Sequence, residues 1–331
     1  MVVLLVAIGV GTYGYYVHGL GIRPGFEKLQ IVEEGRTVKT YEWAVKADMP
    51  TARTEVAAAI LNGKIYVVGG LDGFGRTLAT VEVYDPQTNA WSRAPDLPEG
   101  RHHAAVAVID NTLFVLGGFG GINFQPKPDV FAFNPQTRSW VRKAELPSPR
   151  GGLAVSTWNG KIFAVAGVGP EGLTGELTVY DPHTDTWQTK TPAPTKRDHL
   201  AAAALEGKLY VSGGRKLSLT KNLATLEIYD PQTDSWEEGP PMPTARGGIA
   251  AAVFEKTFVV VGGEQPRSTF GEVEGFNPKT GSWTRLPNLP TPRHGLAAVS
   301  IGNRLFVLGG GKRPTLSVSK SNEMLEAREG N

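Results

Sequence analysis

The chain of 331 residues contains no cysteine. This absence excludes disulfide bonds, thiolate metal ligands and a cysteine nucleophile. A surplus of charge of one sign is also lacking, because 34 basic and 32 acidic side chains leave a formal net charge of +2. Bulk charge therefore gives no support for a nucleic-acid partner, and we expect none. Any electrostatic function must come from the local placement of charges.

Common catalytic motifs are missing as well. The sequence has neither a His-Glu-x-x-His nor a Gly-x-Ser-x-Gly motif. Two Gly-x-Gly-x-x-Gly matches, at residues 167–172 and 9–14, do not open a helix of a βαβ unit, which dinucleotide binding requires. The sequence therefore favours a protein that is not an enzyme and that needs no cofactor or metal.

Long apolar runs are confined to the N-terminus. Residues 1–17 carry no charge, and the segment 1–22 reaches the ~20 residues that a membrane-spanning helix needs. We expect a membrane anchor at residues 1–22, with a cleaved signal peptide or a soluble segment as alternatives, and a linker at 23–39. We expect the remainder to be extracytoplasmic, although Arg23 and Lys28 favour the cytoplasm by the positive-inside rule.

The most regular feature is a repeat. Six times a tryptophan is followed ten residues later by an arginine, and the arginine seventeen residues later by a glycine. The six sets are Trp43, Arg53, Gly70; Trp91, Arg101, Gly118; Trp140, Arg150, Gly167; Trp187, Arg197, Gly214; Trp236, Arg246, Gly263; and Trp283, Arg293, Gly310. Successive sets are 47 to 49 residues apart, a period typical of repeat architectures.

Each unit predicts four short strands, a to d. In the first unit the apolar runs 56–60 and 64–68 flank Asn62-Gly63, a two-residue hairpin signal. Strands at 81–84 and 90–93 follow, joined by a turn that begins Asp85-Pro86. One such sheet cannot bury both of its faces, so the copies must stack around an axis.

A Gly-Gly pair closes strand b in five of the units, and a spaced tyrosine and tryptophan follow it. The third unit departs from this pattern with Ala166-Gly167. Over residues 40–328 the sequence resembles the kelch repeat, which implies an all-β, six-bladed β-propeller. Residues 40–49 contain a lone strand d and residues 323–326 a lone strand c, so we expect the N-terminal strand to close the last blade.

The side of the propeller with the d–a and b–c loops carries the repeated arginines and the loops of variable length. We expect these arginines to ring the central mouth as candidate binding residues. The alternative is that each arginine satisfies loop carbonyl groups in its own blade. The candidates are Arg53, Arg101, Arg150, Arg197, Arg246 and Arg293, together with Arg215, His102, His199, His294 and Phe124.

The histidines after the arginines fall in blades two, four and six. Three imidazoles can hold a divalent ion. We expect side chains two blades apart to be too distant for ligand bonds of about 2 Å, so that these histidines are polar lining of the channel.

The resemblance implies a binding scaffold. We expect a membrane-tethered propeller that binds a protein or peptide partner, and an acidic segment is one kind of partner that would suit it. The alternatives are an accessory subunit of a membrane complex and an extracytoplasmic carbohydrate-active protein. A galactose-oxidase-like copper site is excluded because it needs a cysteine. A sialic-acid epimerase-like mutarotase would use the arginines for a sugar carboxylate and Glu55, Glu171, Asp198 or a histidine as acid or base.

Overall fold

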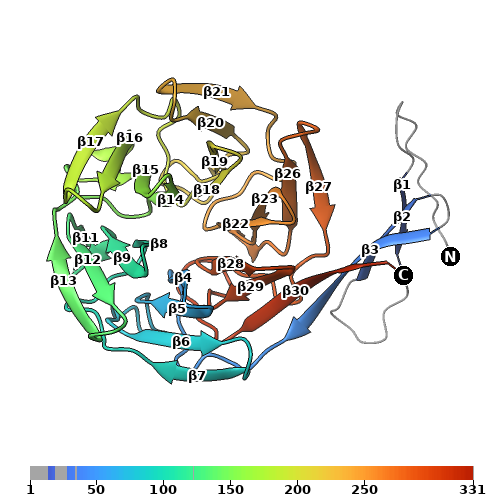
Figure 1. The fold of residues 1–331 in the computed structure, drawn as a ribbon, viewed down its shortest axis with the longest axis horizontal. Helices are drawn as coiled ribbons and strands as arrows, with labels where there is room; N and C mark the ends of the chain where they lie inside the picture. Colours follow the sequence, from blue (N-terminus) through green and yellow to red (C-terminus); the bar gives the residue numbers. More distant parts are fainter. Residues whose placement is uncertain (1–13, 19–27, 34–35, 122, 331) are drawn as a thin grey trace.

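The computed structural model describes residues 14–18, 28–33, 36–121 and 123–330. In Figure 1 the strands form a closed ring of six sheets around a central axis, as the kelch resemblance implies. The described residues contain strands and turns but no helix. The expected all-β, six-bladed propeller is therefore confirmed.

Each blade is an up-and-down antiparallel sheet whose first strand is innermost. The first three blades contain β4 (Ala57–Leu61), β5 (Lys64–Val68), β6 (Val81–Asp85), β7 (Ala90–Arg93); β8 (Ala105–Ile109), β9 (Thr112–Leu116), β12 (Val130–Asn134), β13 (Ser139–Lys143); and β14 (Ala154–Trp158), β15 (Lys161–Gly169), β16 (Gly172–Asp181), β17 (Thr186–Lys190).

The other three blades follow the same order. They contain β18 (Ala201–Leu205), β19 (Lys208–Ser212), β20 (Leu226–Asp230), β21 (Ser235–Gly239); β22 (Ala250–Phe254), β23 (Thr257–Val261), β26 (Val273–Asn277), β27 (Ser282–Leu286); and β28 (Ala297–Ile301), β29 (Arg304–Leu308), β30 (Asn322–Glu329), β3 (Arg36–Val45). Short hairpins β10 (Phe119–Gly120) with β11 (Gln125–Pro126) and β24 (Glu264–Gln265) with β25 (Ser268–Thr269) lie in two b–c loops.

The N-terminal strand closes the ring. Strand β3 pairs antiparallel with β30, with Trp43 opposite Leu325, so the outermost strand of the last blade comes from the start of the chain. Leu325 is fully buried and Trp43 nearly so, in a core shared with the fifth blade. Closure covers the β30 edge with β3, so the third strand of the last blade is not left unpaired.

Parts of the expected linker at 23–39 are strands in the structure. Strand β2 (Lys28–Glu33) pairs with β3, and β1 (Gly14–His18) pairs with β2, so the sixth sheet has two additional strands that extend beyond the ring in Figure 1. Most of the expected anchor at 1–22 lies outside the described residues, and its described part, 14–18, is a strand rather than a helix. Among the described residues, no helix could cross a membrane.

The repeated tryptophans join each blade to the one before it. Every indole Nε1 donates a hydrogen bond to a backbone carbonyl oxygen of the preceding blade at 2.8 to 3.0 Å. The pairs are Trp43 with Pro287, Trp91 with Ala47, Trp140 with Pro95, Trp187 with Ala144, Trp236 with Thr191 and Trp283 with Pro240. The tryptophan of the unit is therefore an inter-blade contact.

The glycine of the unit makes a second inter-blade contact through its backbone. The Gly70 N–H donates to the carbonyl oxygen of Arg101 in the next blade at 2.8 Å, and Gly310 donates to Arg53 across the closure at 2.9 Å. A Cβ on the preceding Gly69 would lie 2.2 Å from the Arg101 carbonyl oxygen, so the side chain must be absent there. In the third blade Ala166 takes that position with a φ of 59°, beside a register shift in the β15–β16 pair.

Candidate functional site at the mouth of the propeller

The six repeated arginines are buried inside their blades rather than open to the mouth. Their exposed fractions are 0 to 2%. The Arg53 guanidinium donates to the Gly69 carbonyl oxygen at 2.8 Å and to Glu82 at 2.8 Å. The expectation that these arginines present their side chains to a ligand is therefore wrong, and the alternative that they satisfy carbonyl groups of their own blades is confirmed.

Each buried arginine also has an acidic partner on the third strand of its blade or just before it. The partners are Glu82 for Arg53, Asp129 for Arg101, Glu176 for Arg150, Glu227 for Arg197, Glu274 for Arg246 and Glu323 for Arg293. Burial lowers the pKa of Arg246 to about 10, while Glu274 opposes that change. The guanidinium groups therefore stay charged near neutral pH, and removing either partner would leave a buried charge.

The residues two positions after the arginines form a closed ring on the axis. They are Glu55, His103, Gly152, His199, Gly248 and Gly295, and all six have φ between 52° and 71°. Their backbones are joined from blade to blade: His103 N–H donates to Glu55 at 3.2 Å, and Gly295 N–H donates to Gly248 at 2.9 Å. The ring closes where Val56 N–H donates to Gly295 at 3.2 Å. We call these six residues the axial ring.

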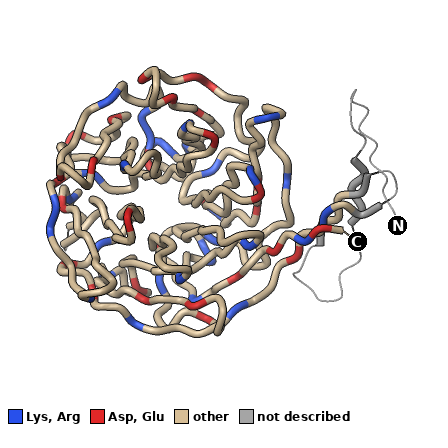
Figure 2. The backbone as a smooth tube through the Cα atoms, in the orientation of Figure 1, with Lys and Arg blue, Asp and Glu red and all other residues tan. Residues whose placement is uncertain are grey.

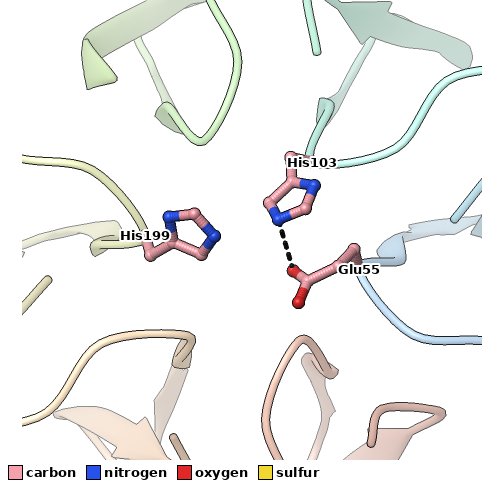
Figure 3. Close-up of side chains that lie close together, drawn as sticks. All are labelled: Glu55, His103 and His199. Carbon is pink, nitrogen blue, oxygen red and sulfur yellow. Dashed lines mark ion pairs between the residues drawn. The ribbon is translucent and has the colours of Figure 1, made fainter. Parts of the chain in front are cut away.

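Glycine at three positions of the axial ring makes room for the side chains at the other three. A Cβ on Gly295 would lie 2.5 Å from Glu55 Oε1, so an alanine there would displace the carboxylate. The side chains of Glu55, His103 and His199 point inward over the axis in Figure 3. A cavity of ≈ 90 Å³ is lined by the axial ring and the residue that follows each member.

Glu55, His103, His199 and His294 come together at the mouth, and we call them the axial cluster. His103 Nε2 lies 3.1 Å from Glu55 Oε2, and His294 Nδ1 lies 3.3 Å from Glu55 Oε1. The rings of His103 and His199 meet edge to face with their centres 4.6 Å apart. The expectation that histidines two blades apart lie far from one another is therefore wrong for His103 and His199, because position two after the arginine lies close to the axis; His294 instead joins Glu55 and Glu264.

Charged side chains surround the axial cluster. His199 Nδ1 lies 2.6 Å from Asp198 Oδ2, and Arg215 NH2 lies 2.8 Å from His199 Nε2. The Arg215 guanidinium also contacts Glu264 at 2.6 Å. Of the expected candidates, the structure thus brings His199, His294 and Arg215 together beside Glu55.

Burial and these neighbours set the charges of the axial cluster. Burial lowers the pKa of His103 well below its usual range, which makes this imidazole neutral near pH 7. Burial alone would raise the pKa of Glu55, but His103 and His294 outweigh it and hold that pKa well below its ordinary value. Burial also opposes protonation of His294, yet its contact with Glu55 raises the pKa of His294. The carboxylate is therefore ionised beside at least one neutral imidazole.

Phe124 and His102 lie to one side of the axis. Their rings meet edge to face with centres 4.6 Å apart, and His102 Nδ1 lies 2.5 Å from His103 Nδ1. Burial lowers the pKa of His102 to about 4. Phe124 is 46% exposed and lines a cavity of ≈ 420 Å³ with Arg76 and Thr77 between blades one and two. Phe124 is thus exposed to solvent, whereas His102 supports His103.

His103 and Glu264 are site residues that sequence reasoning left out of the candidates. The useful signal was the position two residues after each arginine, which reads Glu, His, Gly, His, Gly and Gly around the ring. The sequence groups the histidines, but the direction of the His103 and His199 side chains depends on the left-handed backbone at that position. Glu264 comes from a b–c loop, and nothing in its local sequence predicts its contact with His294, at 3.5 Å.

Comparisons with known proteins agree with the fold. A family model described as the KLHDC2/KLHL20/DRC7 Kelch-repeats domain matches residues 35–192 and 143–310. Beta-scruin of Limulus polyphemus is 39% identical over 51 residues, 15% of this chain and 6% of that protein. An F-box/kelch-repeat protein of Arabidopsis thaliana is 47% identical over 45 residues, 14% of this chain and 12% of that protein.

The chain thus spans only a small part of the length of these curated relatives. The solved structure of YjhT superposes with a TM-score of 0.74 and 18% identity, covering 86% of this chain and all of YjhT, which shows a common fold. Because the two matches of the family model together span residues 35–310, the chain belongs to the kelch-repeat β-propeller family.

Proposed function

We propose that this propeller binds the acidic segment of a protein partner through the b–c loops of blades four, five and six. These loops carry five exposed cations, which we call the basic loop surface. Its members are Lys216, Lys221, Arg267, Lys312 and Arg313. Kelch propellers are commonly binding scaffolds, and loops held by a rigid scaffold are where binding residues concentrate.

The surplus of unpaired positive charge is the observation that carries this proposal. None of the five cations forms an ion pair with a described residue. Glu171 in blade three is the one exposed acid on the described b–c loops, because Asp72, Asp129 and Glu264 are buried and Glu176 and Glu272 are half-buried. Figure 2 shows acids and bases mixed around the whole ring, so the surplus is local. Such a surface attracts a carboxylate-rich segment and increases its association rate.

Exposed apolar side chains stand among the same loops. Leu217 is 61% exposed beside Lys216, and Leu316 is 48% exposed close to Arg313. Phe74 of the neighbouring blade-one loop is 85% exposed. A partner that combines acidic residues with a few large apolar ones would use both kinds of contact, because apolar anchors supply affinity and charges supply orientation.

A random peptide library displayed on phage tests the proposal. We expect the peptides selected on the full chain to be rich in Asp and Glu with interspersed Leu or Phe. The double variant Lys216→Glu/Lys312→Glu should weaken binding of a selected peptide at least ~10-fold, since each lost charge contact contributes of order 1 kcal/mol. Fluorescence anisotropy at low and high salt measures the affinity.

The matched control places the same charge change on the opposite side. Lys256→Glu/Lys279→Glu alters exposed lysines of the a–b and c–d turns of blade five and should leave the affinity unchanged. Selected peptides without acidic enrichment, or equal weakening by both double variants, would contradict the proposal.

A second candidate function is a mutarotase for acidic sugars, favoured by the acid–base groups of the axial cluster. Glu55 and His103 lie 3.1 Å apart beside a cavity, and Arg215 supplies a nearby cation for a sugar carboxylate. An ionised carboxylate and a neutral imidazole can act as a proton-transfer pair. Polarimetry of an acidic sugar tests this candidate: a rate no faster than the spontaneous one removes it.

Attachment to a membrane by residues 1–22 remains part of the proposal, supported by their apolar sequence. An accessory role within a membrane complex would depend on the same attachment. Alkaline extraction of membranes from cells that express the full chain, or a chain beginning at residue 28, tests both. Release of the full chain by alkali would contradict the attachment, and a protease-protection assay would report its side.

A further inference from the structure

We propose that Glu55, His103 and His199 bind a divalent transition-metal ion of the zinc class on the axis of the propeller. These residues come from three different blades and belong to the axial ring. Two imidazoles and one carboxylate are a ligand set that zinc accepts, with a further position left for water. This inference concerns the axis and is independent of peptide binding at the basic loop surface.

The distances are suitable for one shared ion. One ligand atom from each residue lies within 4.8 Å of the other two. Ligand bonds of about 2.0 to 2.1 Å in a tetrahedron bring ligand atoms roughly 3.3 Å apart. Because the axial ring fixes the three backbones, metal binding requires side-chain rotations that close the remaining gap. Figure 3 shows the three side chains directed at the same point.

The charges of the site favour a cation. Described polar contacts of the Glu55 carboxylate are to imidazoles, at 3.1 Å from His103 and 3.3 Å from His294, and not to an Arg or Lys side chain. Asp198 and Glu264 add two further carboxylates nearby, so that three carboxylates face the guanidinium of Arg215 and the imidazole of His294. Burying excess negative charge is unfavourable, and a divalent ion would compensate it.

Asp198 supports His199 in the way that outer residues support zinc-binding histidines. Its Oδ2 lies 2.6 Å from His199 Nδ1, which directs the Nδ1 hydrogen to Asp198 and leaves Nε2 as the metal ligand. A carboxylate in this position fixes the ring and increases its basicity.

Arg215 competes with a metal ion for His199 Nε2. Its NH2 group lies 2.8 Å from His199 Nε2, so metal binding requires this contact to open. The guanidinium has a second partner in Glu264 at 2.6 Å and can keep it when it leaves His199. Removing Arg215 should therefore strengthen metal binding, an effect that a purely structural role for the histidines does not predict.

The site is large enough and exposed enough to take up a metal ion. The side chains of Glu55, His103 and His199 are 10 to 14% exposed, so an ion can reach them from solvent. The cavity of ≈ 90 Å³ beside them accepts an ion with a bound water, whose share of liquid volume is about 30 Å³.

Isothermal titration of Zn²⁺ into the untagged full chain tests the proposal. We expect one ion per chain, with at least 100-fold weaker binding in His103→Gln and His199→Gln. Asp198→Asn should weaken binding 10- to 100-fold, as outer-residue changes do at known zinc sites. Arg215→Gln should strengthen it. The matched control is His183→Gln, because His183 lies 72% exposed on the opposite side of the propeller.

Two results would overturn the proposal: no saturable binding by the parent chain, or affinity in His103→Gln equal to that in His183→Gln. Circular dichroism and thermal melting show whether each variant folds. If a variant does not fold, anomalous diffraction at the zinc absorption edge from parent crystals soaked in Zn²⁺ decides the matter. A peak between the three side chains supports the site, and its absence there refutes it.

Discussion

Trp43 and Pro287 are joined by a hydrogen bond across 244 residues of chain, in which the indole Nε1 donates to the carbonyl oxygen at 3.0 Å. The other five tryptophans of the repeat make the same bond to the blade before their own. The contact shows that the N-terminal strand replaces the fourth strand of a blade whose other three strands come from the C-terminus. Stability of the ring should therefore depend on both ends of the chain.

Deletion of residues 1–45 should abolish the single cooperative unfolding transition. It removes β3, uncovers the β30 edge and breaks the Trp43 bond to Pro287. Differential scanning calorimetry measures the transition. Deletion of residues 1–27 is the control, because it keeps β2 and β3 and should retain a sharp transition. A chain that begins at residue 46 and melts like the parent would contradict closure by β3.

Arg197→Met should lower the free energy of unfolding by about 3 to 5 kcal/mol, because it leaves Glu227 buried without its charge partner. The double variant Arg197→Met/Glu227→Leu should recover much of that loss, since apolar side chains of similar volume tolerate the same environment. Urea denaturation measures all three proteins. Arg76→Met is the control, since this arginine is exposed and its pair with Asp72 should contribute about 1 kcal/mol or less. Equal losses in Arg197→Met and Arg76→Met would disprove the burial argument.

The free energy of unfolding should fall in acid because Asp129 loses its negative charge. Burial acts to raise the pKa of this carboxyl, but Arg101 and Arg142 outweigh it and lower the pKa below its ordinary value. A lowered folded pKa contributes stability above the unfolded pKa of about 3.9, and that contribution is lost as the pH falls through the folded pKa. The difference in unfolding free energy between the parent and Asp129→Asn should therefore be large at pH 7 and shrink steadily below about pH 4.

The control for this pH dependence is Asp96→Asn, which breaks the exposed pair between Asp96 and Arg93. It should change stability little at any pH. A difference between the parent and Asp129→Asn that stays constant from pH 7 to strong acid would show that the Asp129 charge does not stabilise the fold.

Gly295→Ala should cost more stability than Gly152→Ala. Both glycines have positive φ, near 56° and 63°, so both alanines incur the left-handed penalty of roughly 1–2 kcal/mol. Only at residue 295 would the new Cβ also lie 2.5 Å from Glu55 Oε1, because the nearest atom at residue 152 is 3.5 Å away. Overpacking of this kind typically costs a further 1–3 kcal/mol. Indistinguishable melting of the two variants would contradict the packing of the axial ring.

The hairpin turns and the number of blades could be predicted from turn residues and from the spacing of the repeat. Asn62 and Gly63 both take positive φ, as a two-residue hairpin requires. The fixed spacing from tryptophan through arginine to glycine predicted the repeat, because all three residues make the same contact in every blade. A contact that recurs at a fixed spacing can be recognised from the sequence alone.

The local sequence could not predict which arginines are exposed. Arg53 and Arg76 are both loop arginines in the first unit, yet the first is buried against Glu82 and the second is exposed. Burial depends on the distance from the axis and on carboxylates of later strands, so the repeat alone could not decide whether its arginines bind a ligand or carbonyl groups of their own blades.

The sequence by itself determined the all-β class, the number of blades, the chain closure and the regular turns, because each rests on short-range propensity or on an exact spacing. Tertiary structure alone decided what lies at the mouth. Glu55, His103 and His199 are 48 and 96 residues apart, and they meet only because closure of the ring brings one position of three blades to a common axis. The same closure buries the repeated arginines and leaves the lysines and arginines of three variable loops exposed.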